Sequence, residues 1–231
     1  MATTWPSSTP VTNRPGGGPV TVFLVRHGEV ENPDRVVYAD LPGFGLSDRG
    51  RSEAAAAASF LEPMGVTAIY ASPLERAQET ASFISEACGV PVGSREDLTE
   101  WLVARRWKGV TWEDLPTAFP GELEAYLDHP TDLPFAQESI PQLGARVAGA
   151  VADLAAAHPG ERIVIVSHQD PIQAGRLTLR DLPLEELHLN RPGHCDVLTL
   201  EPGEPWQEVG HWVPIIDGPA PPEWPPVSGG G

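Results

Sequence analysis

Short apolar runs alternate along the chain with segments that carry the signals of helices. Continuous β-branched and apolar runs of this length are typical of strands that are buried on both faces of a sheet. Such runs predict strands at residues 20–25, 67–71, 162–166 and 195–200. Because helices separate them, the pattern predicts an α/β protein: a three-layer α/β/α sandwich around a mainly parallel sheet.

Helix start and stop signals lie between these runs. Ser47 is a favourable N-cap for an alanine-rich helix that extends to about Phe60. Ser72-Pro73-Leu74-Glu75 has the form of a capping box with proline at the first helical position, and this helix should end near Gly89. Further helices are predicted from Ser139 to about residue 157 and from Asp170-Pro171 onward.

Composition divides the chain into a body and two tails. Residues 1–18 are rich in Pro, Gly, Ser and Thr, and residues 202–231 contain eight prolines, so both segments are expected to be tails. The body, residues 19–201, is expected to be one domain. Within it, residues 101–137 combine scattered prolines with aromatic residues and should form an insertion over one end of the sheet.

The charge balance limits the classes of partner. The chain has 15 basic and 32 acidic residues, a net charge of −17, so we expect neither nucleic-acid nor membrane binding. The two cysteines form no disulfide framework, and residues 1–18 lack the pattern of a secretory signal, so a cytoplasmic location is expected. The composition leaves the oligomeric state open between monomer and homodimer.

Polar residues that can bind or attack a phosphate group follow three of the predicted strands. Arg26 and His27 follow the first strand, Arg76 comes one turn into the helix after the second, and His168 follows the third. In parallel sheets these positions converge beyond the carboxyl ends of the strands. Guanidinium groups match phosphate oxygens, and a neutral imidazole is a competent nucleophile. The set therefore predicts phosphoryl transfer on a small phosphorylated substrate.

The motifs around these residues resemble those of the histidine phosphatase superfamily, in its phosphoglycerate mutase-like branch. The resemblance covers about residues 20–201. The matching segments occur in the family's order: Leu24–Glu29 (LVRHGE), Leu46–Arg51, Ser72–Ala81 (SPLERAQETA), Leu98–Glu100, Glu138-Ser139 and Val166–His168.

The resemblance implies a role for each matched residue. His27 would be the nucleophile that carries the phosphoryl group, while Arg26, Arg76 and His168 would hold the phosphate oxygens. Glu100 would protonate the leaving oxygen and then activate water. A carboxyl group in a desolvated pocket beside a phosphate should have a raised pKa, which suits this role. The resemblance requires no metal and implies no other cofactor.

Two further residues are candidates for substrate binding near the nucleophile. Gly28 would let the backbone approach the phosphate closely. Asn32 is matched to the family's asparagine, although it lies one position early.

Several positions depart from the family pattern and are expected to narrow the pocket or change its specificity. Val30 replaces a residue with a hydroxyl group, and Glu53 stands where glutamine is usual. Gln137 and Gln169 replace glycines, the second directly after His168.

The sequence leaves three alternatives to a phosphatase. A phosphomutase would use Arg105 and Arg106 to hold a substrate carboxylate or second phosphate, although both are equally compatible with the surface. His27, His168 and Glu100 could instead bind a metal, but the neighbouring arginines would repel a cation. A protein that binds a phosphorylated ligand without turnover is the third. Aromatic residues of the insertion could form an apolar lid over the leaving group: Trp101, Trp107, Trp112 and Phe119.

Overall fold

The computed structural model describes residues 18–216, so residues 1–17 of the tail predicted at 1–18 and residues 217–231 of the tail predicted at 202–231 lie outside the described residues. A six-stranded sheet forms the centre of the described part, with the strand order β3-β2-β4-β1-β5-β6. Strands β1 to β4 are mutually parallel, β5 is antiparallel to β1, and β6 is antiparallel to β5. The strands are β1 Thr21–Arg26, β2 Ala68–Ala71, β3 Val92–Ser94, β4 Arg162–Ser167, β5 Val197–Glu201 and β6 Gln207–Trp212.

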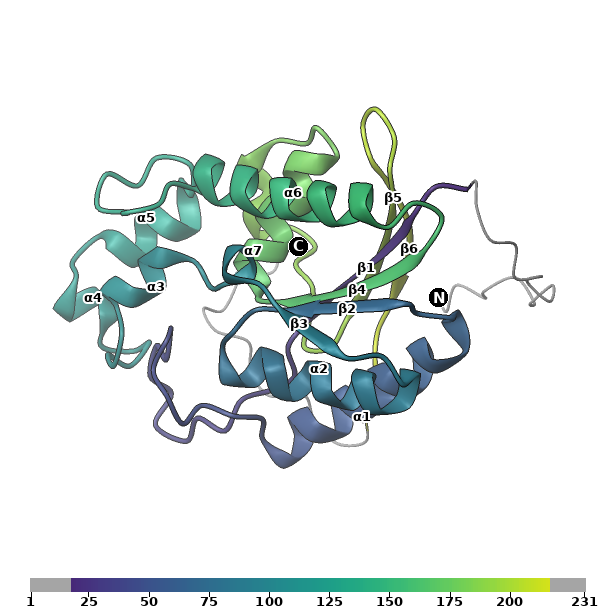
Figure 1. The fold of residues 1–231 in the computed structure, drawn as a ribbon. Coiled ribbons are helices and arrows are strands. Elements are labelled where there is room, and N and C mark those ends of the chain that lie inside the picture. The colour runs from purple at the N-terminus through teal and green to yellow at the C-terminus, as the bar shows by residue number, and fades with distance from the viewer. Residues whose placement is uncertain (1–17, 217–231) are drawn as a thin grey trace.

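Long helices cover both faces of this sheet (Figure 1). Helices α1 (Asp48–Leu61) and α2 (Glu75–Cys88) lie on one face, and α6 (Ile140–Ala157) and α7 (Gln169–Leu179) lie on the other. This arrangement confirms the predicted α/β/α sandwich with a mainly parallel sheet. Among the described helices, none combines the length and apolar character needed to cross a membrane.

The alternation of side chains along the central strands produces two separate cores. In β4, Ile163 and Ile165 join the cluster that includes α6 and α7, whereas Val164 and Val166 join the cluster of α1 and α2. All four are at most 1% exposed. Successive residues of a strand point to opposite faces, so a strand that is covered on both sides must be apolar at every position.

Of the four predicted helix starts, two are confirmed, the one at Asp170 lies one residue after the first residue of α7, and one is wrong. The side chains of Ser47 and Ser139 cap α1 and α6, and Ser139 forms a capping box with Gln142. Helix α2 begins only at Glu75, without a side-chain cap. The Ser72 amide donates to the Val166 carbonyl, and its hydroxyl hydrogen-bonds with the ring of His168, so Ser72 extends β2 instead of capping a helix.

The predicted insertion is more regular than expected and the predicted domain boundary is too early. Residues 101–137 contain three short helices, α3 Leu102–Arg106, α4 Leu115–Ala118 and α5 Glu122–Asp128. The boundary at residue 201 excludes β6, which pairs along β5. Trp212 at the end of β6 stacks on Phe60 of α1, with ring centroids 4.6 Å apart.

Helices α6 and α7 approach each other through glycine, and this predicts two opposite mutational effects within one helix. A Cβ on Gly144 would lie 2.4 Å from Thr178 Oγ1 and 3.1 Å from the Ala174 carbonyl oxygen. Gly144→Ala should therefore reduce the free energy of unfolding by about 1–3 kcal/mol. A Cβ on Gly149 meets nothing within 4 Å. Gly149→Ala should instead raise the free energy of unfolding by about 0.5–1 kcal/mol, since alanine favours the helix. Urea unfolding measures both, and stabilisation by both variants would contradict the packing described.

Candidate active site

The pairing of β1 with β4 brings His27 and His168 together. Arg26, the last residue of β1, is in register with Ser167, the last residue of β4, so the next residue of each strand leaves the sheet at the same edge. The two imidazole ring centroids are 5.2 Å apart with an interplanar angle of 61°. His27 is 2% exposed and His168 is fully buried.

The hydrogen bonds of His27 define which ring nitrogen carries the proton. Nδ1 lies 2.8 Å from the Gly28 carbonyl oxygen, which accepts only, so Nδ1 carries the hydrogen. The Arg76 Nε–H group donates to His27 Nε2 over 3.2 Å, so Nε2 presents a lone pair. Burial, reinforced by the charge of Arg76, holds the pKa of His27 well below its usual value. The imidazole is therefore neutral near pH 7.

A close backbone approach explains the glycine at position 28. A Cβ on Gly28 would lie 2.6 Å from the Gly50 carbonyl oxygen, and a Cβ on Gly50 would lie 2.0 Å from the Glu29 carbonyl oxygen. The Gly28 amide donates to Thr80 Oγ1 over 3.0 Å. Gly28 therefore docks the loop after β1 onto α1 and α2. Its amide is engaged by Thr80, and the approach of this backbone to a phosphate stays a prediction.

Arg76 lies in the first turn of α2 and links the other groups. Its side chain is buried under the ring of Tyr38, with the guanidinium carbon 4.7 Å from the ring centroid. Besides its bond to His27, Nη2 lies 3.4 Å from Glu100 Oε2. A guanidinium held on several sides in this way has a fixed direction, which favours recognition of an oxyanion.

Glu100 faces this cationic cluster from a third segment of the chain. Its Oε1 accepts the Trp101 amide over 2.9 Å, and its Oε2 lies 3.6 Å from His168 Nδ1. Burial raises the pKa of Glu100 against the opposing charge of Arg76, and the charge of Asp170 raises it further. The carboxyl group is thus suited to exchange a proton nearer neutral pH than an ordinary glutamate.

Arg146 secures the segment that carries Glu100. Its guanidinium donates to both carboxylate oxygens of Glu138, over 2.7 and 3.0 Å, and to the carbonyls of Asp97 and Thr99. The Glu138 carbonyl in turn accepts from the Trp101 indole. The matched Glu138-Ser139 segment therefore helps to hold the chain around Glu100 in place, through Arg146.

The structure adds His194, which the sequence analysis does not identify. His194 Nε2 lies 2.9 Å from Arg26 Nη2, and its ring centroid is 5.9 Å from that of His27. Burial and the charge of Arg26 lower its pKa well below the usual value, so it accepts a hydrogen bond from that arginine. His194 comes from the loop before β5, where no strand end or motif signals it.

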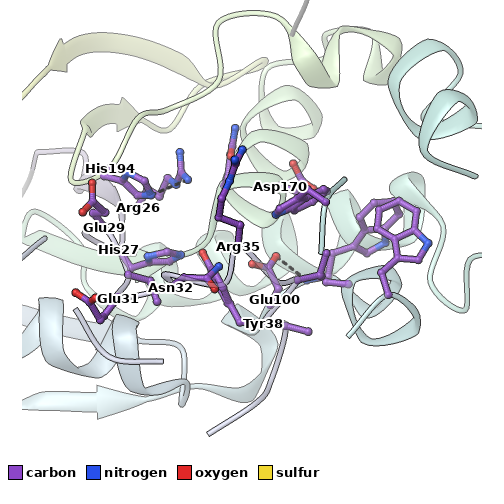
Figure 2. Close-up of a pocket in the computed structure, with 18 of the residues that line it drawn as sticks. Arg26, His27, Glu29, Glu31, Asn32, Arg35, Tyr38, Glu100, Asp170 and His194 are labelled. Atoms are coloured by element: carbon purple, nitrogen blue, oxygen red, sulfur yellow. Dashed lines mark hydrogen bonds between the residues drawn. The ribbon is translucent and has the colours of Figure 1, made fainter. Parts of the chain in front are cut away.

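Four of these groups, Arg26, His27, Glu100 and His194, line a cavity of about 410 Å³ (Figure 2). Arg26 and His194 lie at one end of the view, and Asp170 lies towards the other. Aromatic side chains of the insertion line the cavity as well: Trp101, Trp107, Trp112 and Tyr126. Phe119, the remaining aromatic residue of the expected lid, packs against the Arg106 guanidinium instead.

Three of the predicted substrate-binding residues have other contacts. Arg105 and Arg106 do not line the cavity; Arg105 pairs with Asp40 and Arg106 with Glu122. Asn32 does line it, but its amide nitrogen donates to the Val36 carbonyl and its amide oxygen accepts from the Val36 amide. Asn32 therefore shapes its own loop, and the two arginines belong to the surface.

Within residues 18–216, one group of three side chains has the spacing of metal ligands. His27, Glu100 and His168 each offer an atom, and these atoms lie within 4.8 Å of one another. Arg76 contacts both His27 Nε2 and Glu100 Oε2. Its fixed positive charge favours an anion there over a divalent cation, so the residue set fits a phosphoryl group better than a metal.

Comparison with known proteins identifies the family. The family model of the histidine phosphatase superfamily, branch 1, matches residues 22–213. The chain belongs to this superfamily. The matched range includes β6, in agreement with the structure.

Several members of the histidine phosphatase superfamily are similar over most of the chain. An uncharacterized protein of Mycobacterium tuberculosis is 38% identical over 170 residues, covering 68% of this chain and 77% of the relative. Phosphoserine phosphatase 1 of Hydrogenobacter thermophilus is 30% identical over 156 residues, covering 67% of this chain and 74% of the relative. The solved structure of a mycobacterial glucosyl-3-phosphoglycerate phosphatase has a TM-score of 0.72 and 28% identity, covering 82% of this chain and 96% of that one.

The protonation of His27 gives a direct prediction. We expect NMR titration to show the Nδ1–H tautomer near pH 7 and a pKa below the usual value of 6.5. Arg76→Met should raise that pKa, because removing a neighbouring cation makes the imidazolium less unfavourable. Arg180→Met, which removes an arginine paired with Glu208, is the matched control and should leave it unchanged. An Nε2–H tautomer, or a pKa at 6.5 or above, would contradict the described geometry.

Proposed function

We propose that the protein is a phosphatase that hydrolyses small phosphomonoesters through a phosphohistidine on His27. The observation that carries the proposal is the unprotonated Nε2 of His27, flanked by Arg76 at 3.2 Å and lying across from His168 in a buried cationic cluster. A neutral nitrogen nucleophile beside fixed positive charges is what transfer of an anionic phosphoryl group requires.

The first step transfers the phosphoryl group to the enzyme. The Arg76 N–H group moves from Nε2 to a phosphate oxygen, and the Nε2 lone pair then forms a bond to phosphorus while the bond from phosphorus to the ester oxygen breaks. Arg26, Arg76 and His168 stabilise the charge on the other three oxygens. Glu100, in its protonated form, gives its proton to the leaving oxygen, so the alcohol departs neutral. The negative charge of the substrate raises the pKa of His168, which strengthens its donation, while the adjacent Arg76 keeps the pKa of His27 low and its Nε2 unprotonated.

The second step releases phosphate. Glu100, now a carboxylate, accepts a proton from water as the water oxygen bonds to phosphorus. The bond from phosphorus to Nε2 breaks, inorganic phosphate leaves, and Glu100 regains its proton. Every proton and electron pair is accounted for by His27, Glu100 and water, so the sequence of steps requires no metal.

Hydrolysis is favoured over a mutase reaction by the lining of the cavity. A phosphoglycerate mutase-type enzyme needs cations for the carboxylate of its substrate, and the candidates for this, Arg105 and Arg106, pair with acidic residues outside the cavity. Glu31 and Asp170 instead add negative charge to the lining. This distribution supports water as the acceptor.

The covalent intermediate is the first test. Brief reaction with a ³²P-labelled monoester should label the protein with an acid-labile, base-stable adduct. His27→Ala should abolish the label and reduce kcat roughly 10⁴-fold, since the nucleophile is lost. His129→Ala, which removes an exposed histidine, should retain both the label and the wild-type kcat. A ligand-binding protein without turnover would give no adduct, and full activity in His27→Ala would remove the nucleophile assignment.

The role of Glu100 predicts a dependence on the leaving group. Glu100→Gln should lower kcat for an alkyl phosphate by about 10²- to 10⁴-fold, because an alkoxide leaves poorly without a proton. The loss in the rate of adduct formation should be much smaller for p-nitrophenyl phosphate, whose leaving group needs no proton. Glu86→Gln, at an exposed site on α2, is the matched control. Equal losses in the rate of adduct formation with the two esters would argue against Glu100 as the acid.

A further inference from the structure

A polar pair at the start of α7 has no contact with the substrate assigned so far. Gln169 and Asp170 directly follow His168, and both line the cavity. The Gln169 Nε2 atom is buried and has no hydrogen-bond partner among residues 18–216. A buried amide donor without a partner costs free energy, about 1–3 kcal/mol, unless a ligand satisfies it.

Asp170 offers the complementary function. Its Oδ2 accepts the hydroxyl of Tyr126 over 2.9 Å, which fixes the direction of the carboxylate. Its neighbour Gln169 has an N–H group that can donate a hydrogen bond, whereas an ionised Asp170 carboxylate only accepts hydrogen bonds. The pair therefore presents one donor and one acceptor on adjacent residues of the cavity wall.

The insertion supplies an aromatic wall to the same cavity. Trp101, Trp107 and Trp112 line it. The rings of Trp107 and Trp112 pack edge to face, with their centroids 6.4 Å apart. The indole N–H groups of Trp101 and Trp107 already donate to the Glu138 carbonyl and the Glu122 carboxylate. These two rings are each 2% exposed and reach the cavity with an apolar edge, whereas the half-buried Trp112 is the more accessible ring of the wall.

The charges of the lining limit what the leaving group can carry. Besides Glu100, three carboxylates line the cavity: Glu29, Glu31 and Asp170. Arg35 lines it too, and is paired with Glu113 at 2.8 Å. A carboxylate on the leaving group would satisfy Gln169 but be repelled by Asp170, and an amine would satisfy Asp170 alone. A hydroxyl group both donates and accepts, so hydroxyl groups satisfy the two residues together.

We infer that the substrate is the phosphate ester of a neutral, ring-shaped, hydroxylated alcohol. Its hydroxyl groups bond to Gln169 and Asp170, and an apolar face of its ring packs on the tryptophan wall. The cavity of about 410 Å³ is large enough for such a ring. Gln169 is thus a specificity-determining residue, at the position where the resemblance predicted a glycine. This inference rests on the proposed phosphatase activity.

Three esters that differ in the groups on the ring test the inference. Cyclohexyl phosphate has a six-membered ring without hydroxyl groups, glucose 1-phosphate has a hydroxylated ring that also contains an oxygen atom, and glucuronate 1-phosphate has a carboxylate in addition. We expect kcat/KM for glucose 1-phosphate to exceed that for each of the other two by about tenfold or more.

Variants assign the preference to the polar pair. Gln169→Leu should lower the ratio of kcat/KM for glucose 1-phosphate to that for cyclohexyl phosphate by about tenfold, since the hydrogen bond is lost. Asp170→Asn should raise kcat/KM for glucuronate 1-phosphate relative to glucose 1-phosphate. Any effect of Asp170 on Glu100 cancels in this ratio, because both esters use the same acid. Gln207→Leu, on the exposed strand β6, should leave both ratios unchanged.

The outcomes separate this inference from the proposed function. A wild-type preference for cyclohexyl phosphate or glucuronate 1-phosphate would overturn it, as would a ratio that Gln169→Leu does not change. Hydrolysis of p-nitrophenyl phosphate but of none of the three esters would also overturn it, while leaving the phosphatase in place. Failure to hydrolyse any monoester, p-nitrophenyl phosphate included, would remove the proposed function and this inference with it.

Discussion

The hydrogen bond between His27 Nδ1 and the Gly28 carbonyl is the contact on which the site depends. A single neutral hydrogen bond contributes only about 1 kcal/mol to stability. Its importance lies in fixing the tautomer, because it leaves the Nε2 lone pair facing Arg76. Gly28 and Gly50 hold that carbonyl in place through a backbone approach that no side chain could enter. Tight packing at two glycines thus determines the chemistry of the neighbouring ring.

The cluster around that ring is arranged for an anion. Two arginines and three histidines gather there, and burial keeps the histidines neutral by lowering their pKa values. Glu100 shows the converse effect, since burial raises its pKa. The site therefore holds its groups, before substrate binds, in the protonation states that the proposed nucleophilic attack and proton donation require.

Local sequence predicted the parts of the molecule that local rules control. Strand ends placed His27 and His168 at one edge, because apolar runs identify buried strands and parallel strands share their carboxyl ends. Ser72 was misassigned as a helix cap because its partner, His168, is 96 residues away. His194 and β6 were missed for the same reason: their positions follow from contacts with Arg26 and β5 that no short segment encodes. Arg105 was ambiguous in sequence because its partner, Asp40, lies on another loop.

A crystal structure with bound vanadate would test the central claim most directly, because vanadate imitates the phosphoryl group in transfer. The account predicts vanadium bonded to Nε2 of His27, with its equatorial oxygens bonded by Arg26, Arg76 and His168. An apical oxygen would lie beside Glu100. Vanadate bound through Nδ1, or held away from the His27 ring, would contradict the account.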